Sequence, residues 1–121
     1  MSLNLQAQAD GRYVLDCPEQ MEGSVRLDLV EQLRVALAGK PIHGLIVDLD
    51  SVAYMSSSGI DALFALRKFV TDAGGRMVLA RPNATIQRLL QTVSLDRLVP
   101  IVASLAEARA ALDQPAGHPQ A

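Results

Sequence analysis

The chain has 121 residues, of which half are apolar and only 3% aromatic, and its formal net charge is −2. This length suits one domain around a single aliphatic core, and the absence of a basic stripe argues against direct binding of DNA or RNA, because such binding needs cations that neutralise phosphates. A single cysteine, Cys17, excludes an internal disulfide, and no apolar run approaches the roughly 20 residues that span a bilayer, so we expect a cytoplasmic protein.

The first third of the chain predicts a β-hairpin followed by a helix. Apolar and polar residues alternate over 3–9, and 13–17 is a second short strand after an Asp-Gly turn. Residues 18–23 are expected to form a loop. Ser24 is placed to cap a helix that Gly39 and Pro41 end. The expected inward faces consist of Leu3, Leu5 and Ala7 on the first strand, and Val25, Leu29, Leu33 and Leu37 on the helix.

Strands and helices alternate through the rest of the chain. We expect strands over 45–49, 76–80 and 98–102, and helices over 60–70, 84–93 and 104–112, the last opened by the capping-box pair Ser104 and Glu107. This order predicts an α/β domain with a mixed sheet, in which an opening hairpin precedes parallel strands and four to five helices pack against them. The domain is expected to cover 1–112, with a disordered polar tail over 113–121.

The stretch VAYMSSSGID, residues 52–61, places three serines where a buried strand turns into a helix. Serine is among the commonest helix N-cap residues, and Ser58 with Asp61 has the spacing of a capping-box variant, so position alone favours a structural role. A hydroxyl at a helix N-terminus is also open to phosphorylation, which adds about −1.5 to −2 charges. The helix dipole tolerates that charge, whereas an apolar or acidic partner surface would not.

Serine hydrolysis is disfavoured by the sequence around the cluster. A nucleophile elbow requires Gly-x-Ser-x-Gly and a histidine base, but Met55 and Ser58 occupy the two glycine positions around Ser57. The two histidines, His43 and His118, are not placed to activate it and are expected in solvent.

Other catalytic and ligand-binding motifs are also incomplete. A phosphoaspartate receiver could use Asp48 and Asp50, but the chain lacks the acidic metal cluster and has Arg81 where the lysine is needed. Asp48 is instead expected to face solvent. The glycines of 73–75 follow a helix, as in a C-cap, rather than opening one, as a nucleotide site requires. Zinc ligands are lacking, and we expect neither a metal nor a cofactor.

The order of these features resembles the STAS domain family, the fold of bacterial anti-sigma factor antagonists. The similarity covers about residues 3–112. It rests on the buried strand, the Tyr54–Met55 pair before a Ser-Ser-Gly helix start, the Gly-Gly junction at 74–75, Pro82 after the next strand, and a Leu-Asp pair at 95–96 before the final strand.

The resemblance implies a switch at the serine cluster. The family pattern is Asp-Ser-Ser/Thr-Gly, in which a partner kinase phosphorylates the serine after the Asp. Carried over, the phosphoacceptor is Ser57, ahead of Ser58 and Ser56, and Gly59 is the family glycine. Ser56 replaces the family Asp. The chain departs from the family pattern at two further places. Residues 18–21 read Pro-Glu-Gln-Met where the family often reads Gly-Glu-Leu-Asp, and Ser94 stands where the family often has a glycine.

The first functional hypothesis is a non-enzymatic regulatory module. With Ser57 free, it would bind an anti-sigma factor with a serine-kinase fold and so release a sigma factor; with Ser57 phosphorylated, it would let go. A phosphatase is a further candidate partner, and the chain is expected to be a monomer or weak dimer. The expected partner face consists of Met21, Glu22, Met55, Ser56, Ser57, Ser58, Gly59 and Ile60, with both methionines exposed, although ordinary packing is the favoured interpretation of Met55.

Two alternatives remain. The same fold and edge could dock constitutively as the small subunit of a bacterial lipid-transport ATPase, with no phospho-switch, and the replacement of the family Asp by Ser56 favours this hypothesis. A hydrolase that uses Ser57 is third.

Overall fold

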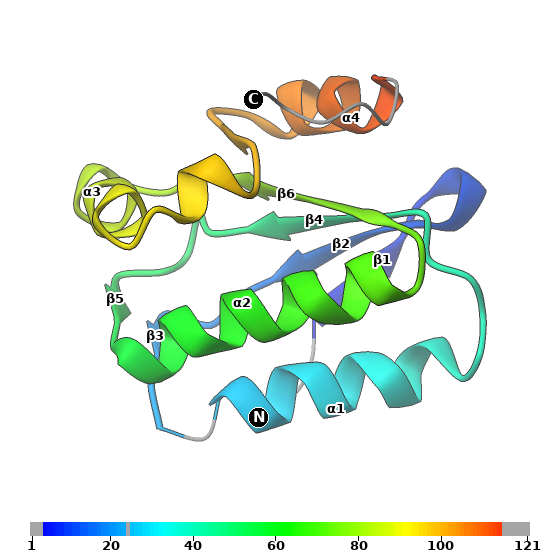
Figure 1. Cartoon of the computed structure of the whole chain (residues 1–121), viewed down its shortest axis with the longest axis horizontal. Helices are drawn as coiled ribbons and strands as arrows, with labels where there is room; N and C mark the ends of the chain where they lie inside the picture. Colours follow the sequence, from blue (N-terminus) through cyan, green and yellow to red (C-terminus); the bar gives the residue numbers. More distant parts are fainter. Residues whose placement is uncertain (1–3, 24, 115–121) are drawn as a thin grey trace.

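The computed structural model describes residues 4–23 and 25–114, which form a sheet covered on both faces (Figure 1). Helices α1 and α2 lie on one face and α4 on the other, while α3 lies at one end. The helices are α1 Val25–Leu37, α2 Ser57–Asp72, α3 Ala84–Thr92 and α4 Leu105–Asp113. The strands are β1 Asn4–Ala7, β2 Arg12–Asp16, β3 Gln20–Met21, β4 Gly44–Asp48, β5 Tyr54–Met55, β6 Arg76–Ala80 and β7 Ile101–Val102.

The main sheet has the strand order β1-β2-β4-β6-β7. Strand β1 pairs with β2 antiparallel, and every other pair in this sheet is parallel. The hairpin turn over Ala9–Gly11 places Asp10 at φ 61° and Gly11 at φ 73°, the left-handed conformation that Asp tolerates and that Gly adopts without steric cost. The predicted mixed sheet with an opening hairpin is therefore confirmed, and the described residues form four α-helices, within the predicted four to five.

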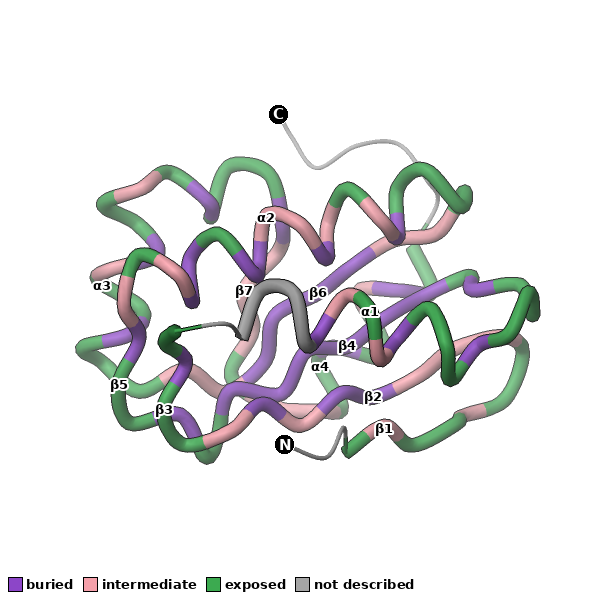
Figure 2. Tube along the Cα trace, turned by 90° about the horizontal axis from the view of Figure 1, so that it is seen from below, coloured by how far each residue is buried: buried purple, intermediate pink, exposed green. Residues whose placement is uncertain are grey.

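Two apolar clusters hold the layers together, one on each face of the sheet. Beneath α1 and α2 lies the larger cluster, which includes Leu45 and Val47 of β4. Beneath α4 lies a smaller one, which includes Ile46 of β4 and Leu112 of the helix. Strand β4 is therefore buried along its whole length, as its near-continuous apolar run predicted. In Figure 2 the buried residues follow the strands beneath the two helices, whereas β1 at the edge is mostly exposed.

The helices follow the predicted apolar periodicity. On α1, Leu29, Leu33 and Leu37 are buried. Helix α4 opens as predicted, because the Glu107 N–H donates to the Ser104 Oγ at 3.1 Å. In the reciprocal bond of the capping box, the Glu107 Oε1 accepts from the N–H of Ala103 at 3.4 Å rather than from that of Ser104. The predictions for Leu3, the Ser24 cap, the side chain of Val25, His118 and residues 115–121 fall outside what the structure describes.

The prediction of a plain loop over 18–23 is wrong. Residues Gln20 and Met21 form β3, which pairs in parallel with β5, Gln20 opposite Tyr54 and Met21 opposite Met55. This small sheet lies at the end of the main sheet, beside the first turn of α2 (Figure 1). Two residues are too few for a periodic pattern to predict a strand, and the partner strand is more than 30 positions away. The pairing positions the serine cluster.

Candidate functional site

Helix α2 begins at the serine cluster, and Ser56 is its N-cap. The Ser56 Oγ accepts a hydrogen bond from the N–H of Ser58 at 3.2 Å. The same hydroxyl donates to the backbone oxygen of Met21 at 3.3 Å, and the Ser56 N–H donates to that oxygen at 2.9 Å. Ser56 therefore fixes the start of α2 to β3. The predicted capping pair of Ser58 and Asp61 is wrong, because the helix starts earlier and its cap is Ser56.

Gly59 brings the first turn of α2 against the small sheet. A Cβ at this position would lie 2.5 Å from the Met21 backbone oxygen, 2.6 Å from the Met55 Cγ and 2.8 Å from the Met21 Cβ. Every other residue type would have to push this turn of the helix away. The glycine is therefore required by close packing, which agrees with its expected place at the site.

The structure divides the predicted partner face into buried and exposed residues. Met21 is fully buried, so its expected exposure is wrong, whereas Met55 is 6% exposed, which agrees with the packing role favoured for it. They fill the space between the small sheet and α2. Gly59 and Ile60 are also buried. Ser57 and Glu22 are exposed, and Ser58 and Ser56 are half-buried. The surface that another molecule can reach is thus narrower than the sequence pattern predicted.

Tyr54 is a surface residue that the site prediction missed. Its side chain is 51% exposed, although Met55 beside it is buried. In a strand, consecutive side chains point to opposite faces, so the pairing of β5 with β3 turns Tyr54 outward. An aromatic residue before Met55 was noted in the sequence, but its exposure depends on the β3–β5 pairing.

Backbone and side-chain hydrogen bonds hold the segment before the cluster on two sides. The Glu19 backbone oxygen accepts from the N–H of Ala53 at 2.8 Å and of Tyr54 at 3.2 Å. From the other side, the Asn83 Nδ2 donates to the Val52 oxygen at 3.1 Å. The Asn83 Oδ1 also accepts from the Ile86 N–H at 2.8 Å and caps α3. Asn83 therefore links the start of α3 to the chain that leads to the serines.

An ion pair between the buried Asp48 and the partly exposed Arg81 lies at the same edge of the sheet, at the carboxyl ends of β4 and β6. Asp48 is only 3% exposed, so the expectation that it faces solvent is wrong. Its carboxylate accepts from the Arg81 Nε at 3.1 Å and the Arg81 Nη2 at 2.7 Å, and from the Asp50 N–H at 3.1 Å. Alternation with Val47 and Leu49 predicted the exposure of Asp48 wrongly, because helices cover both faces of the sheet. The pair ties adjacent strands together.

The carboxyl groups of this cluster have opposite pKa shifts. Burial acts to raise the pKa of Asp48, but the hydrogen bonds from Arg81 and the Asp50 N–H outweigh it and hold that pKa below its ordinary value. Asp16, opposite Asp48 in the parallel register, has a raised pKa because of burial and the neighbouring Asp48 carboxyl. Every strong acceptor of Asp48 is engaged within the fold, which points to a structural role for the cluster.

Among residues 4–23 and 25–114, the structure places no histidine where it could serve Ser57 as a catalytic base. His43 is exposed and its backbone N–H donates to the Gly11 backbone oxygen at the hairpin turn, at the opposite end of the parallel strands from Ser57. Burial raises the pKa of the Cys17 thiol, which disfavours the reactive thiolate. Within 4–23 and 25–114, no three His, Cys, Asp or Glu side chains are grouped to hold a metal ion. Over the same residues, no helix is long and apolar enough to cross a membrane.

Comparison with known proteins places the sequence pattern and the fold in one family. The family model described as the STAS domain matches residues 5–108. Over 70 residues the chain is 26% identical to a protein of Paenibacillus polymyxa named anti-sigma F factor antagonist. That alignment spans 58% of this chain and 60% of the relative.

Solved structures share the fold. An anti-sigma factor antagonist from Mycobacterium paratuberculosis superposes with a TM-score of 0.74 at 23% identity, over 93% of this chain and 94% of that one. The Bacillus cell-fate determinant SpoIIAA in its phosphorylated form superposes with a TM-score of 0.70 at 16% identity, over 92% and 99% of the two chains. Together with the family match over most of the sequence, these similarities show that the chain belongs to the STAS domain family.

Proposed function

We propose that this protein is an anti-sigma factor antagonist, a non-enzymatic module whose partner affinity is controlled at Ser57. The observation that carries the proposal is the free, exposed Ser57 hydroxyl at the first position of α2, which makes no hydrogen bond to the described residues. Ser57 lies in the first turn of α2, whose position is fixed by the hydrogen bonds of Ser56 and the close packing of Gly59. The name of the Paenibacillus relative supports the same function.

Of the three serines, Ser57 is best suited to accept a phosphoryl group. The Ser56 hydroxyl is occupied, because it both caps α2 and donates to the Met21 oxygen. Ser58 is half-buried. A kinase needs an accessible hydroxyl, and modification of Ser56 would also remove the cap and the tie to β3. Ser58 and Ser56 therefore rank below Ser57 as phosphoacceptors.

A phosphate on Ser57 would be compatible with the isolated domain. The first N–H groups of a helix have no intrahelical acceptors, and the helix dipole favours negative charge there. The exposed position keeps the dianion hydrated. Asp61, one helical turn further, and Glu22 beside β3 are exposed as well, so their repulsion with the phosphate is screened by water and salt.

A bound partner would remove that hydration. Tyr54, Glu22 and Ser57 face solvent around the first turn of α2. Further along α2, Asp61, Phe64, Ala65 and Lys68 line a hollow of about 520 Å³ on the same helix, and Ser57, Asp61 and Ala65 recur every four residues. A partner that covers Tyr54 and this stretch of α2 would desolvate a phosphate at Ser57, and an unpaired buried charge is strongly unfavourable. Phosphorylation would therefore dissociate the complex.

The partner that we propose is an anti-sigma factor with a serine-kinase fold, with a phosphatase to restore the free hydroxyl. The anti-sigma factor would meet Tyr54 and Ser57 directly, while Met21, Met55, Gly59 and Ile60 support the surface from below. We place the lipid-transport ATPase subunit second. Its support is Ser56, which stands where the family has an acidic residue, but the named relatives above point to anti-sigma factor antagonism.

Phosphate mapping tests this function. The protein is incubated with ATP and a cognate serine kinase, and the phosphate is located by tandem mass spectrometry. We expect one phosphate, on Ser57, and none in Ser57→Ala. Ser58→Ala is the matched control and keeps the modification. No phosphate on residues 56–58, or co-purification of the native protein with a transport ATPase alone, would contradict the proposal.

A further inference from the structure

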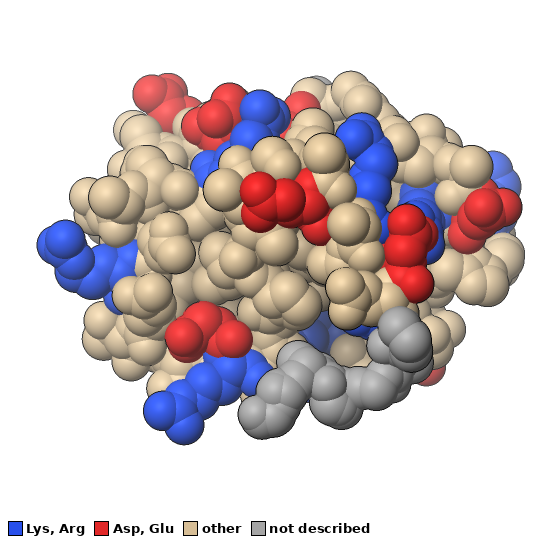
Figure 3. Space-filling view, turned by 90° about the horizontal axis from the view of Figure 1, so that it is seen from above, with Lys and Arg blue, Asp and Glu red and all other residues tan. Residues whose placement is uncertain are grey.

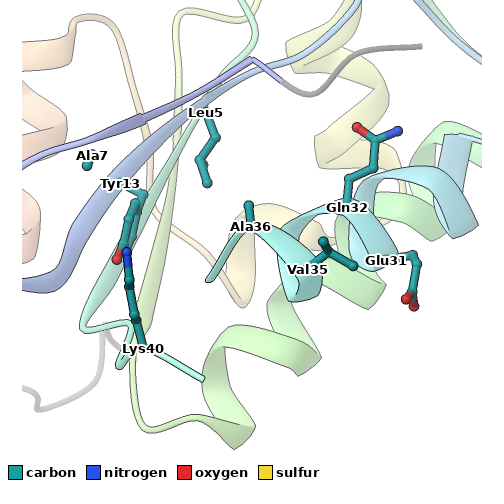
Figure 4. Close-up of a pocket in the computed structure, with 8 residues that line it drawn as sticks. All are labelled: Leu5, Ala7, Tyr13, Glu31, Gln32, Val35, Ala36 and Lys40. Carbon is teal, nitrogen blue, oxygen red and sulfur yellow. The ribbon is translucent and has the colours of Figure 1, made fainter. Parts of the chain in front are cut away.

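A second hollow lies far from the serine cluster, between the edge hairpin and α1. Its volume is about 580 Å³, within the range of roughly 300–1,000 Å³ that is typical of small-molecule sites. Figure 4 shows Leu5 and Tyr13 pointing from β1 and β2 towards α1, while Val35 lies on the helix across the gap. The walls thus come from the strands β1 and β2 on one side and the second half of α1 on the other.

The floor of this groove is apolar surface that the fold leaves uncovered. Leu5 belongs to the face of the sheet that α1 and α2 cover, but β1 lies at the edge and Leu5 is only half-buried. Val35 is 67% exposed, the largest exposed fraction among the large apolar side chains of residues 4–23 and 29–114. Leu5 and Val35 both line this concave space, with Ala36 between them on the helix side, so an apolar chain placed there would cover them.

The charges of the groove favour an anion at one end. Glu31 is paired with Arg34 at 2.6 Å, so its charge is compensated. Lys40 has no ion pair with any described residue, and its side chain extends towards Tyr13 (Figure 4). The Tyr13 hydroxyl likewise makes no hydrogen bond to the described part of the chain. A cation and a phenolic donor are thus available together beside the apolar floor.

We propose that this groove binds an amphipathic carboxylate, with the hydrocarbon chain between Leu5 and Val35 and the carboxylate at Lys40 and Tyr13. A hollow of this volume suits a flexible chain better than a second protein, because a flat protein surface would span the opening and leave the hollow unfilled. The proposal commits to a free medium-chain fatty acid and is independent of the function proposed for Ser57.

The test is a titration of the full chain with octanoate, monitored through the NMR chemical shifts of the backbone amides. We expect saturable shifts of residues 5–13 and 31–40, none with acetate, and weaker binding of octanol and octylammonium. Lys40→Gln is expected to weaken the binding of octanoate about fivefold, since one exposed ion pair supplies about that factor, and to leave the binding of octanol unchanged. Val35→Ser should weaken the binding of both octanoate and octanol. Leu98→Ser alters an exposed apolar side chain outside the groove and should change neither affinity.

Three results would overturn the proposal. The first is the absence of saturable shifts in the groove at low millimolar octanoate. The second is an octanoate affinity that Lys40→Gln does not alter, which removes the assigned headgroup contact. The third is a dimer by sedimentation velocity that Val35→Ser converts to monomer, which makes the groove an interface between two copies of the chain.

Discussion

Replacing Gly59 by alanine tests how tightly the serine cluster is fixed to the small sheet. The new Cβ would lie 2.5 Å from the Met21 backbone oxygen and 2.8 Å from the Met21 Cβ, and neither can move without shifting β3. Overpacking of this kind costs about 1–3 kcal/mol. Alanine recovers at most about 1 kcal/mol through its higher helix propensity. We therefore expect a net loss of about 1–2 kcal/mol, which lowers the Tm by roughly 3–10 °C for a domain of this size.

Gly44→Ala provides the matched control. A Cβ at Gly44 also meets a close neighbour, but the nearest atom is the Leu112 Cδ1 at 2.8 Å, the far end of a side chain that can rotate. The same glycine-to-alanine change should therefore cost less there, below about 1 kcal/mol. Thermal and urea unfolding followed by circular dichroism measure both variants. A Gly59→Ala protein as stable as the wild type, or more stable than Gly44→Ala, would refute the close contact between α2 and β3.

The remaining predictions concern the ion pair, the α3 cap and the exposed tyrosine. Asp48→Asn should lower the free energy of unfolding by about 1–3 kcal/mol at pH 7. The difference from the wild type should shrink below about pH 4. The lowered native pKa of Asp48 stabilises the fold above the pKa of the unfolded chain, and this stability is lost as the pH falls through the native pKa. Asp16→Asn should keep or raise stability at pH 7, since a raised native pKa favours the neutral form; a loss in urea unfolding would contradict this. Asn83→Ala should cost about 1–2 kcal/mol and increase amide hydrogen exchange over 52–56, whereas Ser104→Ala, which removes the cap of α4, should leave that exchange unchanged. Tyr54→Ala should keep the Tm but weaken the binding of the anti-sigma factor at least about tenfold, as measured by calorimetry. An unchanged affinity would exclude Tyr54 from the interface.

The elements of the main sheet and the helices could be predicted because their patterns are local. The alternation at the hairpin, the apolar run of β4 and the four-residue spacing of Leu29, Leu33 and Leu37 each depend on neighbouring residues. The small sheet could not be predicted, because two residues carry no period and their pairing depends on the tertiary fold.

The site was predicted only in part for the same reason. The resemblance to the family pattern predicts Ser57 as the phosphoacceptor, and the structure finds it exposed. Met21 lies in what looked like a loop, so its burial follows only from the β3–β5 pairing. Asp48 was assigned to solvent by alternation, which fails where both faces of a strand are covered and a partner such as Arg81 is available. Each error concerns a contact between distant parts of the chain.

The central claim is that a dianion on Ser57 is acceptable to the free domain and excluded from the complex. The most direct measurement is the affinity of the anti-sigma factor for the unmodified protein and for protein phosphorylated stoichiometrically on Ser57, by isothermal titration calorimetry. We predict that phosphorylation weakens binding at least about 100-fold, because an unpaired charge would be buried, while the Tm of the free domain stays within a few degrees. Equal affinities for the two forms would contradict the account.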